Sequence, residues 1–232
     1  MRFDWRSAWR TTSSAALLAL VGSVGVAQED RPPRPPQEKP KEQPQQPPTD
    51  PATPAQQVKA AQVGELAPAI ALKDLDDKEH TLAALKGKVV VLEWFNPDCP
   101  VVQMHYKART FEALRKKYKD LEVVFLAIHS APAATQNRAQ ERSRTVVAEW
   151  KLPDVLLLDR DGKVAKSYGV KVTPEMCVID REGRLAYRGA IDDGSTEAVG
   201  KVNHVDAAIA ELLAKKKVAL PETPAYGCPI QF

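Results

Sequence analysis

The sequence has no strong excess of charge of either sign and no long apolar run. Its number of cysteines is odd. Its formal net charge is only +3 over 232 residues. A nearly neutral surface gives no case for a nucleic-acid partner, which would require a basic face. The cysteines are Cys99, Cys177 and Cys228, and an odd number leaves at least one thiol unpaired within the chain or bonded to another molecule. The cysteines are therefore the first candidates for chemistry.

Residues 1–27 are typical of a secretory signal peptide. Arg2, Arg6 and Arg10 supply a basic start, and residues 15–27 form an apolar run that ends in small side chains. This run is shorter than the roughly 20 residues that cross a membrane. We therefore expect an exported protein, periplasmic or extracellular. If the leader stays uncleaved, it instead tethers the protein to a membrane.

Residues 28–61 are expected to be a disordered, proline-rich linker. Ten of the 19 prolines in the chain lie between Pro32 and Pro54, among Gln, Glu and Lys. Such a segment buries too little apolar surface to offset the entropy of ordering it, and it forms an extended spacer. A ligand for a proline-reading domain is the alternative interpretation.

The remainder has the size of one domain, residues 62–217, followed by a tail, residues 218–232, that carries Cys228. The continuous apolar run over residues 89–95 predicts a strand buried on both faces. The other predicted elements are a small hairpin with one helical turn over 63–85, a helix over 99–119, a strand over 121–128, a helix over 135–150, a strand over 155–158, a short helix ending near 169, a hairpin of strands 175–180 and 185–190, and a helix over 203–217. This alternation predicts an α/β fold with helices on both faces of a central mixed sheet.

Cys99 follows the buried strand and a turn, and Pro100 opens the next helix. Proline suits the first helical position because its missing N–H is not needed there. The unpaired amides and partial positive charge of a helix N-terminus favour the thiolate, which is the form that attacks disulfides and peroxides. The pattern therefore predicts a reactive thiol at Cys99. An inert, buried cysteine at a helix start is the alternative.

Four charged or aromatic residues are candidates for contact with Cys99 or for purely structural roles. The carboxylate of Asp98 would oppose a facing thiolate. His129 ends the second strand on the same edge as Cys99 and is a candidate for binding substrate, with a capping or surface histidine as the alternative. His105 is expected to project away from Cys99, since six residues span about 1.7 helical turns. Tyr106 is expected in the core or at its rim.

The other two cysteines lie in different contexts. Cys177 sits inside a predicted strand, between Met176 and Val178, and is expected to be a small core residue. Cys228 lies in a Gly-Cys-Pro turn near the end of the tail, where there is little core to join. It can reach Cys99 within the chain or across a dimer and resolve a sulfenic acid or mixed disulfide. An interchain disulfide and a free thiol remain open.

The sequence resembles the thioredoxin-like superfamily, in its redoxin (AhpC/TSA-like) branch, over about residues 62–195. The resemblance rests on GELAPAIAL, LKGKVVVLEWF, the Cys-Pro after the first core strand, YGVKVTPEMCVIDREGRLAYRG and the following IDD. It implies a three-layer α/β/α fold, a cis Pro174 beside Cys99 and a proton-transfer role for Glu93, which stands where the family often carries a buried acid. The alternative for Glu93 is a carboxylate bonded to a nearby Lys or Tyr.

The motif also departs from the family. Val102 stands where a thioredoxin has the second cysteine of Cys-x-x-Cys, and Asn96 and Leu92 interrupt the peroxiredoxin pattern Pro-x-x-x-Thr-x-x-Cys. Neither the ordinary dithiol reductase nor the ordinary peroxidase follows. The Gly227-Cys228 pair is similar to that of a set of secreted thioredoxin-family proteins with a Cys-Pro motif.

The leading hypothesis is an exported thiol oxidoreductase without cofactor or metal. Cys99 attacks, and Cys228 or an external thiol completes the cycle, while Glu93 handles protons. Pro100, Thr173, Pro174 and His129 line the substrate site, where the edge at Thr173-Pro174 holds an extended backbone. The partners are a protein or small-molecule disulfide, or a peroxide, and an external thiol donor. The oligomeric state stays open.

Two other functions are compatible with the sequence. One is a non-catalytic thioredoxin-fold binding module, favoured by the missing thiol at Val102. The other is a copper-handling protein, because some secreted relatives bind Cu(I) through Cys-x-x-x-Cys and a distant histidine. Gln103 occupies the second cysteine position here, which leaves Cys99, Met104 and His129 as soft ligands.

Overall fold

The computed structural model describes residues 60–150, 152 and 155–231. The predicted leader and all but the last two residues of the predicted linker lie outside the described residues. Within the described part of the chain, no helix combines the length and the apolar character needed to cross a membrane.

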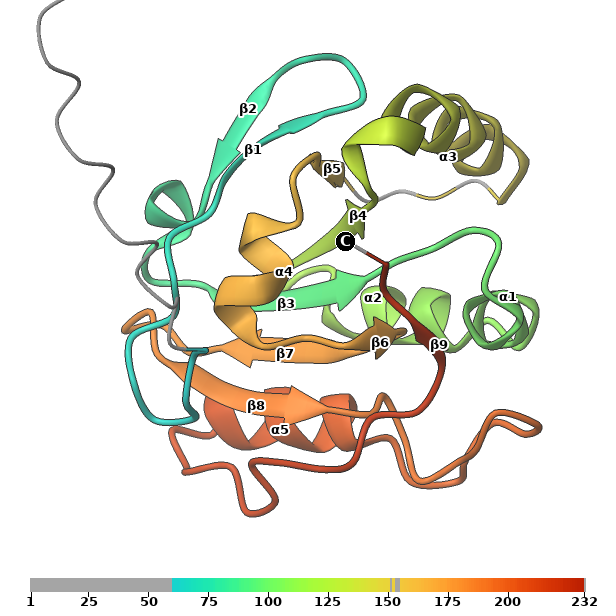
Figure 1. Ribbon diagram of the computed structural model, residues 1–232. Coiled ribbons are helices and arrows are strands. Elements are labelled where there is room, and N and C mark those ends of the chain that lie inside the picture. Colours follow the sequence, from blue (N-terminus) through green and yellow to red (C-terminus); the bar gives the residue numbers. More distant parts are fainter. Residues whose placement is uncertain (1–59, 151, 153–154, 232) are drawn as a thin grey trace, which may run out of the picture. The chain divides into compact units, whose positions relative to one another are not determined.

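A seven-stranded mixed sheet forms the centre of the domain (Figure 1). Its order is β2-β1-β5-β4-β3-β7-β8; β3, β4 and β5 run parallel and the other pairings are antiparallel. In chain order the strands are β1 (Ala71–Asp74), β2 (Glu79–Thr81), β3 (Val89–Trp94), β4 (Val123–Ser130), β5 (Val155–Asp159), β7 (Met176–Ile179) and β8 (Leu185–Gly189). Every residue of central strand β3 is buried, as its apolar run predicted. The mixed α/β sheet is confirmed.

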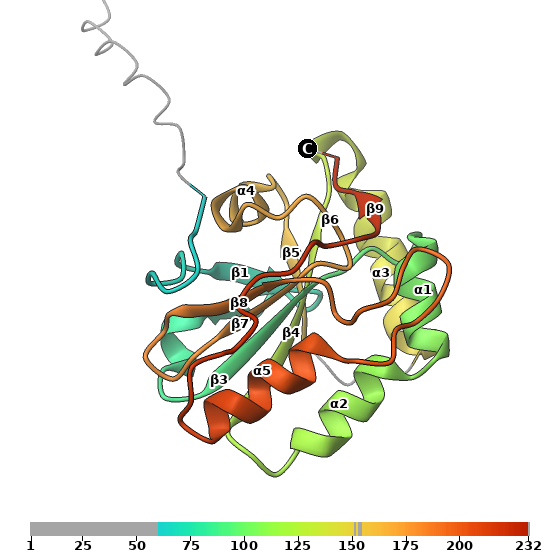
Figure 2. The ribbon, with the colours of Figure 1, turned by 90° about the horizontal axis from the view of Figure 1, so that it is seen from below.

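Helices cover both faces of this sheet. One face packs against α4 (Lys163–Tyr168), and the other packs against four helices: α1 (Pro100–Lys107), α2 (Thr110–Tyr118), α3 (Gln136–Trp150) and α5 (His204–Leu213). Figure 2 shows α4 on the opposite side of the strands from α2 and α5. The right-handed crossovers β3-helix-β4 and β4-helix-β5 step in one direction along the sheet, which puts their helices on one face. The predicted three-layer α/β/α architecture is confirmed.

The predicted single helix over residues 99–119 is wrong, because the chain forms two helices there. Ala108 caps α1, with its N–H directed at the carbonyls of Met104 and Tyr106. Arg109 then adopts a left-handed conformation (φ 57°), which ends the helical path and redirects the chain into α2. The break lets the two helices bury their apolar sides in different clusters, α1 around Phe95 and α2 around Val89 and Val91.

The other predicted elements agree more closely. The hairpin over residues 63–85 is β1-β2, followed by the 3-10 turn η1 (Leu82–Leu85), and a second such turn, η2 (Ala133–Thr135), precedes α3. Strands β7 and β8 form the predicted second hairpin. Helix α5 ends at Leu213, four residues before the predicted end at residue 217. Lys215 has a left-handed backbone (φ 57°), which prevents the helix from continuing.

The C-terminal tail contains a strand that we did not predict. Strand β9 (Cys228–Pro229) pairs antiparallel with β6 (Val172–Thr173), in a small sheet separate from the main one (Figure 1). This pairing returns the tail to the edge of the fold where β3 ends and α1 begins.

Candidate active site

Cys99 lies at the junction between β3 and α1. It is the N-cap residue of α1, and Pro100 takes the first helical position, as predicted from the Cys-Pro pair. Asn96 shapes the preceding turn, since its side chain accepts the N–H of Asp98 (3.0 Å) and its carbonyl accepts the N–H of Cys99 (3.1 Å). Cys99 is only 1% exposed, whereas Pro100 is exposed. The helix N-terminus thus holds the sulfur at a fixed point below the surface.

Cys99 forms a disulfide with Cys228 of the tail. The two residues are separated by 129 positions in the sequence, and their Cα atoms are 5.9 Å apart. Cys228 is half-buried and pairs with Thr173 in the β6-β9 register, and the N–H of Ile230 donates to the carbonyl of Lys171 (2.9 Å). For Cys228 the sequence had left open an intrachain partner, an interchain disulfide and a free thiol, and the structure shows the intrachain disulfide. The tail therefore supplies the second sulfur that Val102 does not.

The loop between β6 and β7 forms one wall of the disulfide site. The Thr173–Pro174 peptide bond is cis, as the resemblance implied, and the carbonyl oxygen of Thr173 lies 3.0 Å from Cys99 Sγ. Glu175 orders this loop, because its Oε2 accepts the N–H of Lys171 (2.9 Å). Burial raises the pKa of Glu175. The edge that we expected to hold an external extended chain holds the protein's own tail.

Glu93 is buried on β3 and is bonded to a tyrosine. Its side chain is 5% exposed, and Oε2 accepts a hydrogen bond from the hydroxyl of Tyr106 on α1 (3.0 Å). This is the tyrosine partnership that was the alternative interpretation of Glu93. Tyr106 also packs edge-on against Phe95, with ring centroids 5.7 Å apart. The acid is thus fixed under α1, on the same face of the sheet as Cys99.

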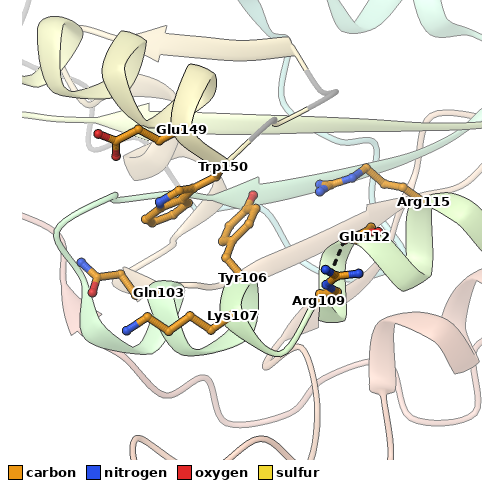
Figure 3. Close-up of a pocket in the computed structure, with 8 residues that line it drawn as sticks. All are labelled: Gln103, Tyr106, Lys107, Arg109, Glu112, Arg115, Glu149 and Trp150. Atoms are coloured by element: carbon orange, nitrogen blue, oxygen red, sulfur yellow. Dashed lines mark ion pairs between the residues drawn. The ribbon is translucent and has the colours of Figure 1, made fainter.

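Tyr106 also lines a cavity of about 550 Å³ between α1, α2 and the end of α3 (Figure 3). Its ring lies 5.1 Å from that of Trp150, and Arg109 pairs with Glu112 at the rim. The lining residues are Gln103, Tyr106, Lys107, Arg109, Glu112, Arg115, Glu149 and Trp150. Neither Cys99 nor Cys228 is among them, so this cavity is separate from the disulfide.

His129 is buried at the carboxyl end of β4. Its Nδ1 lies 2.8 Å from the hydroxyl of Ser143, which is itself fully buried. Burial lowers the pKa of His129 to about 4, although the charge of Asp98 opposes the shift. The ring is therefore neutral near pH 7. It lines a second cavity, of about 310 Å³, together with Asp98, Thr173 and Pro229, which are immediate neighbours of the two cysteines.

Asp98, the residue before Cys99, has a cationic partner. Its exposed carboxylate lies 3.0 Å from Nε of Arg142, which projects from α3. Arg142 also approaches Glu149, at 3.9 Å. The negative charge that we expected to oppose a thiolate at Cys99 is thus partly balanced.

Cys177 is not part of this site. It is fully buried in β7 as a free thiol, and burial raises its pKa. The prediction of a core residue is confirmed. Within the described residues there is no group of three or more His, Cys, Asp and Glu side chains that could hold a metal ion. Cys99, the expected soft ligand for copper, is bonded to Cys228.

Sequence reasoning missed a buried polar cluster that contacts the tail. His105 on α1 is fully buried, and its Nε2 lies 3.1 Å from the hydroxyl of Tyr226, two residues before Cys228. Tyr226 in turn donates to the carboxylate of Asp192. The available signals were a histidine on the buried side of a helix and a lone tyrosine beside the tail cysteine, and neither names its partner.

Comparisons with known proteins agree with this fold. A thiol-disulfide oxidoreductase ResA from Bacillus thuringiensis subsp. konkukian is 25% identical over 124 residues, which cover 53% of this chain and 67% of that protein. A chloroplastic peroxiredoxin Q from Suaeda salsa is 30% identical over 133 residues, which cover 53% and 58%. The crystal structure of an uncharacterised conserved protein from Geobacillus kaustophilus superposes with a TM-score of 0.67 at 28% identity, covering 74% and 92%. The Redoxin family model matches residues 62–209, well over half of the chain, and the protein therefore belongs to the redoxin family.

Proposed function

We propose that the protein is a thiol oxidoreductase whose redox centre is the Cys99–Cys228 pair. The observation that carries the proposal is the disulfide between a cysteine at a helix N-terminus and a cysteine of the tail, beside the cis Thr173–Pro174 bond. The helix N-terminus stabilises a thiolate at Cys99, whether that thiolate attacks a substrate or leaves when the disulfide is reduced.

With a disulfide substrate the reaction has two exchanges. The Cys99 thiolate attacks one sulfur of the substrate, forms a mixed disulfide and releases the other half as a thiolate. The Cys228 thiolate then attacks Cys99 Sγ, closes the Cys99–Cys228 disulfide and releases the second thiolate. The substrate has gained two electrons and the protein has lost two. Two equivalents of an external thiol return the protein to the dithiol. Because Cys228 is the more exposed half of the disulfide, that thiol meets Cys228 first.

A peroxide is the second candidate substrate, supported by the similarity to a peroxiredoxin Q. The Cys99 thiolate attacks the O–O bond, takes one oxygen as a sulfenic acid and releases an alkoxide or hydroxide, which is protonated to an alcohol or water. The thiol of Cys228 condenses with the sulfenic acid, and water leaves as the same disulfide closes. Both substrates thus use one pair of sulfurs.

Other residues are assigned supporting roles in this proposal. Glu93 gives and takes protons from its buried position under α1, and Thr173, Pro174, Pro100 and His129 form the walls next to the sulfurs. The replacement of Glu93 by Gln preserves an oxygen that accepts from Tyr106. An E93Q variant is therefore expected to keep its fold but to exchange more slowly, by about tenfold to a hundredfold. An unchanged exchange rate in E93Q would leave Glu93 with a structural role alone.

We also infer that the chain is exported, as its leader predicts. An intrachain disulfide is typical of oxidising compartments and supports this location. Mass analysis of the protein from the host cell tests it, with a mature N-terminus near residue 28 expected. A chain that retains residues 1–27 in the membrane fraction would instead support the uncleaved anchor.

A turnover assay with single variants tests the proposed activity. Disulfide exchange is followed with a small aromatic disulfide, and peroxide reduction with hydrogen peroxide, each with a thiol donor. C99S is expected to lose turnover entirely, and C228S to lose catalytic cycling while still trapping a mixed disulfide at Cys99. C177A serves as the control and is expected to keep activity. Equal and negligible rates for the wild type and C99S would support the non-catalytic alternative, in which the disulfide only fastens the tail.

A further inference from the structure

The segment before Cys228 is held to the domain by contacts that do not depend on the disulfide. Thr223 accepts the N–H of Ala190 (3.0 Å), and its hydroxyl lies 2.6 Å from that of Tyr187. Glu222 pairs with Arg188 at 2.7 Å. These contacts place Glu222 and Thr223 along β8, upstream of β9 in the tail. The tail is therefore anchored upstream before it reaches the sulfurs.

On the N-terminal side of Cys228, the anchor closest to it is Tyr226. Its hydroxyl donates to Asp192 and lies 3.1 Å from Nε2 of His105. Tyr226 is half-buried, but its two partners are shielded from water: His105 is 0% exposed and Asp192 is 2% exposed. A buried partner that loses its hydrogen bond is costly, because water does not replace the bond. Asp192 is held independently of the tail, because its carboxylate also accepts the N–H groups of Gly194 and Gly200 (2.9 Å each). We call His105, Asp192 and Tyr226 the tail latch.

The proton positions in the tail latch are mutually consistent. Burial lowers the pKa of His105, against the charge of Asp192, so the ring is neutral near pH 7. A proton on Nε2 then donates to the Tyr226 oxygen, and Nδ1 is left to accept from the hydroxyl of Thr110, at 3.4 Å. Burial and the bond to Asp192 raise the pKa of Tyr226, which keeps its own proton for Asp192. Every member of the tail latch therefore has a partner.

The tail latch is tied to the nucleophile through one short helix. Helix α1 carries Cys99 at its N-cap and His105 near its other end, and two tail residues, Tyr226 and Cys228, contact these two points. Gly227 between them crosses the carbonyl of Thr173. Holding Tyr226 thus sets where Cys228 lies, in the same way that a fixed linker raises the effective concentration of a tethered group.

We propose that Tyr226 is a positioning residue. Its bonds to the buried Asp192 and His105 keep Cys228 against Cys99 after the disulfide has been reduced. The inference rests on the proposed function, since it concerns how the resolving thiol is delivered. In a Cys-x-x-Cys motif, sequence proximity keeps the second cysteine close to the first. Here Cys228 is the second cysteine, and the contact of Tyr226 with His105, 121 positions away, keeps it close. The resolving step then draws on a docked strand instead of a freely moving tail.

The first experiment removes the disulfide and asks whether the tail stays docked. Hydrogen exchange is measured in the full-length C228S variant at the amide of Ile230, which donates to the carbonyl of Lys171 (2.9 Å). We expect this amide to be protected in C228S, and its exchange to be about tenfold faster in C228S/Y226F, which loses the hydroxyl. C228S/Y168F is the control, because it also removes one tyrosine hydroxyl, but the lost bond is to the carbonyl of Pro68 (2.8 Å), a residue outside the tail. A freely exchanging Ile230 in C228S, or equal rates in the two double variants, would overturn the proposal.

The second experiment measures the consequence for the redox centre. The reaction of the dithiol with oxidised glutathione gives the protein disulfide and two reduced glutathiones, and its equilibrium constant is obtained from mixtures of known ratio. Y226A, which loses both ring and hydroxyl, is expected to lower this constant at least about tenfold, and Y168F to change it less than twofold. A constant unchanged in Y226A while the melting temperature falls would make Tyr226 a merely structural residue. If the wild-type pair does not exchange with glutathione at all, the proposed function fails, and the exchange of Ile230 still decides whether the tail latch exists.

Discussion

Gly227 passes so close to the carbonyl oxygen of Thr173 that a β-carbon on Gly227 would overlap that oxygen. Its backbone is also left-handed, with φ 147°, a region that residues with side chains rarely adopt. This crossing lies between Tyr226 and Cys228 and lets both reach their partners on α1. A glycine is therefore required by geometry at the one point where the tail crosses the loop of the cis proline.

The first prediction concerns this crossing. Gly227→Ala is expected to displace the tail from β6, because the Thr173 carbonyl belongs to a buried backbone that cannot move aside. The amount of Cys99–Cys228 disulfide formed in a fixed glutathione mixture should fall at least about tenfold. Gly64→Ala is the matched control, since Gly64 also has a positive φ (90°) but no atom within 4 Å of an added β-carbon. Equal effects of the two substitutions would show that backbone strain alone, and not the crossing, matters.

The second prediction concerns stability. Because the disulfide joins residues 129 positions apart, the chain-entropy model assigns it about 5 kcal/mol of unfolding free energy. This stabilisation arises because the disulfide restricts the unfolded chain. Docking of the tail in the folded state does not replace it when the disulfide is absent. C228S is expected to unfold at a lower urea concentration than the oxidised wild type, by a free energy of about 2–5 kcal/mol. The reduced wild type should resemble C228S. Identical urea midpoints for oxidised and reduced protein would contradict the prediction.

The third prediction concerns pH. Burial lowers the pKa of His129 from 6.5 to about 4, so the folded state binds fewer protons than the unfolded state between these values. The unfolding free energy should therefore be fully retained above pH 6.5 and fall as the pH drops toward 4, by up to about 3 kcal/mol. Urea titrations at a series of pH values measure this loss.

His129→Gln is the comparison variant for the pH series. Glutamine keeps a polar contact for Ser143 but does not titrate, so most of the slope should disappear. His105, whose pKa burial also lowers, leaves a slope of the same sign. A full slope in the H129Q variant would assign the effect to other groups.

The fourth prediction concerns the charge beside the nucleophile. In a C228S background, Asp98→Asn removes a negative charge next to Cys99 and should increase the thiolate fraction at pH 7. Arg142→Ala leaves the Asp98 carboxylate without the partner that now lies 3.0 Å away, and should decrease the thiolate fraction. Alkylation of Cys99 by iodoacetamide is expected to rank D98N above the parent and the parent above R142A, with steps of about twofold to fivefold. High salt should compress the three rates, because Asp98 and Arg142 lie near the surface. The reverse order would contradict the prediction.

The local sequence pattern was sufficient to predict much of the fold and the half of the site that contains Cys99. The apolar run that became β3 and the Cys-Pro pair that opens α1 both act through neighbouring residues, so their conformation could be predicted. Cys177 was placed in the core from its apolar neighbours alone. The break between α1 and α2 was missed because it depends on Arg109 in a left-handed conformation, which carries no glycine or proline signal.

The rest of the site depends on contacts between residues far apart in the sequence. The bond of His105 to Tyr226 spans 121 positions, and the crossing of Gly227 with Thr173 and the pairing of β9 with β6 join two segments that have no shared pattern. Periodicity predicts which face of an element is buried, but it does not say which distant polar group meets it there. The tail was accordingly expected to have little core to join, whereas it is docked by a strand and by a tyrosine whose partners, His105 and Asp192, are buried.

The most direct test of the account is a redox titration of the wild-type protein in glutathione mixtures, with each cysteine mapped by mass spectrometry after alkylation. The proposed function predicts one reversible two-electron transition, in which Cys99 and Cys228 change together and Cys177 stays reduced throughout. A Cys99–Cys228 disulfide that persists in native protein at every glutathione ratio, or that does not form again after reduction, would contradict a redox role for this pair.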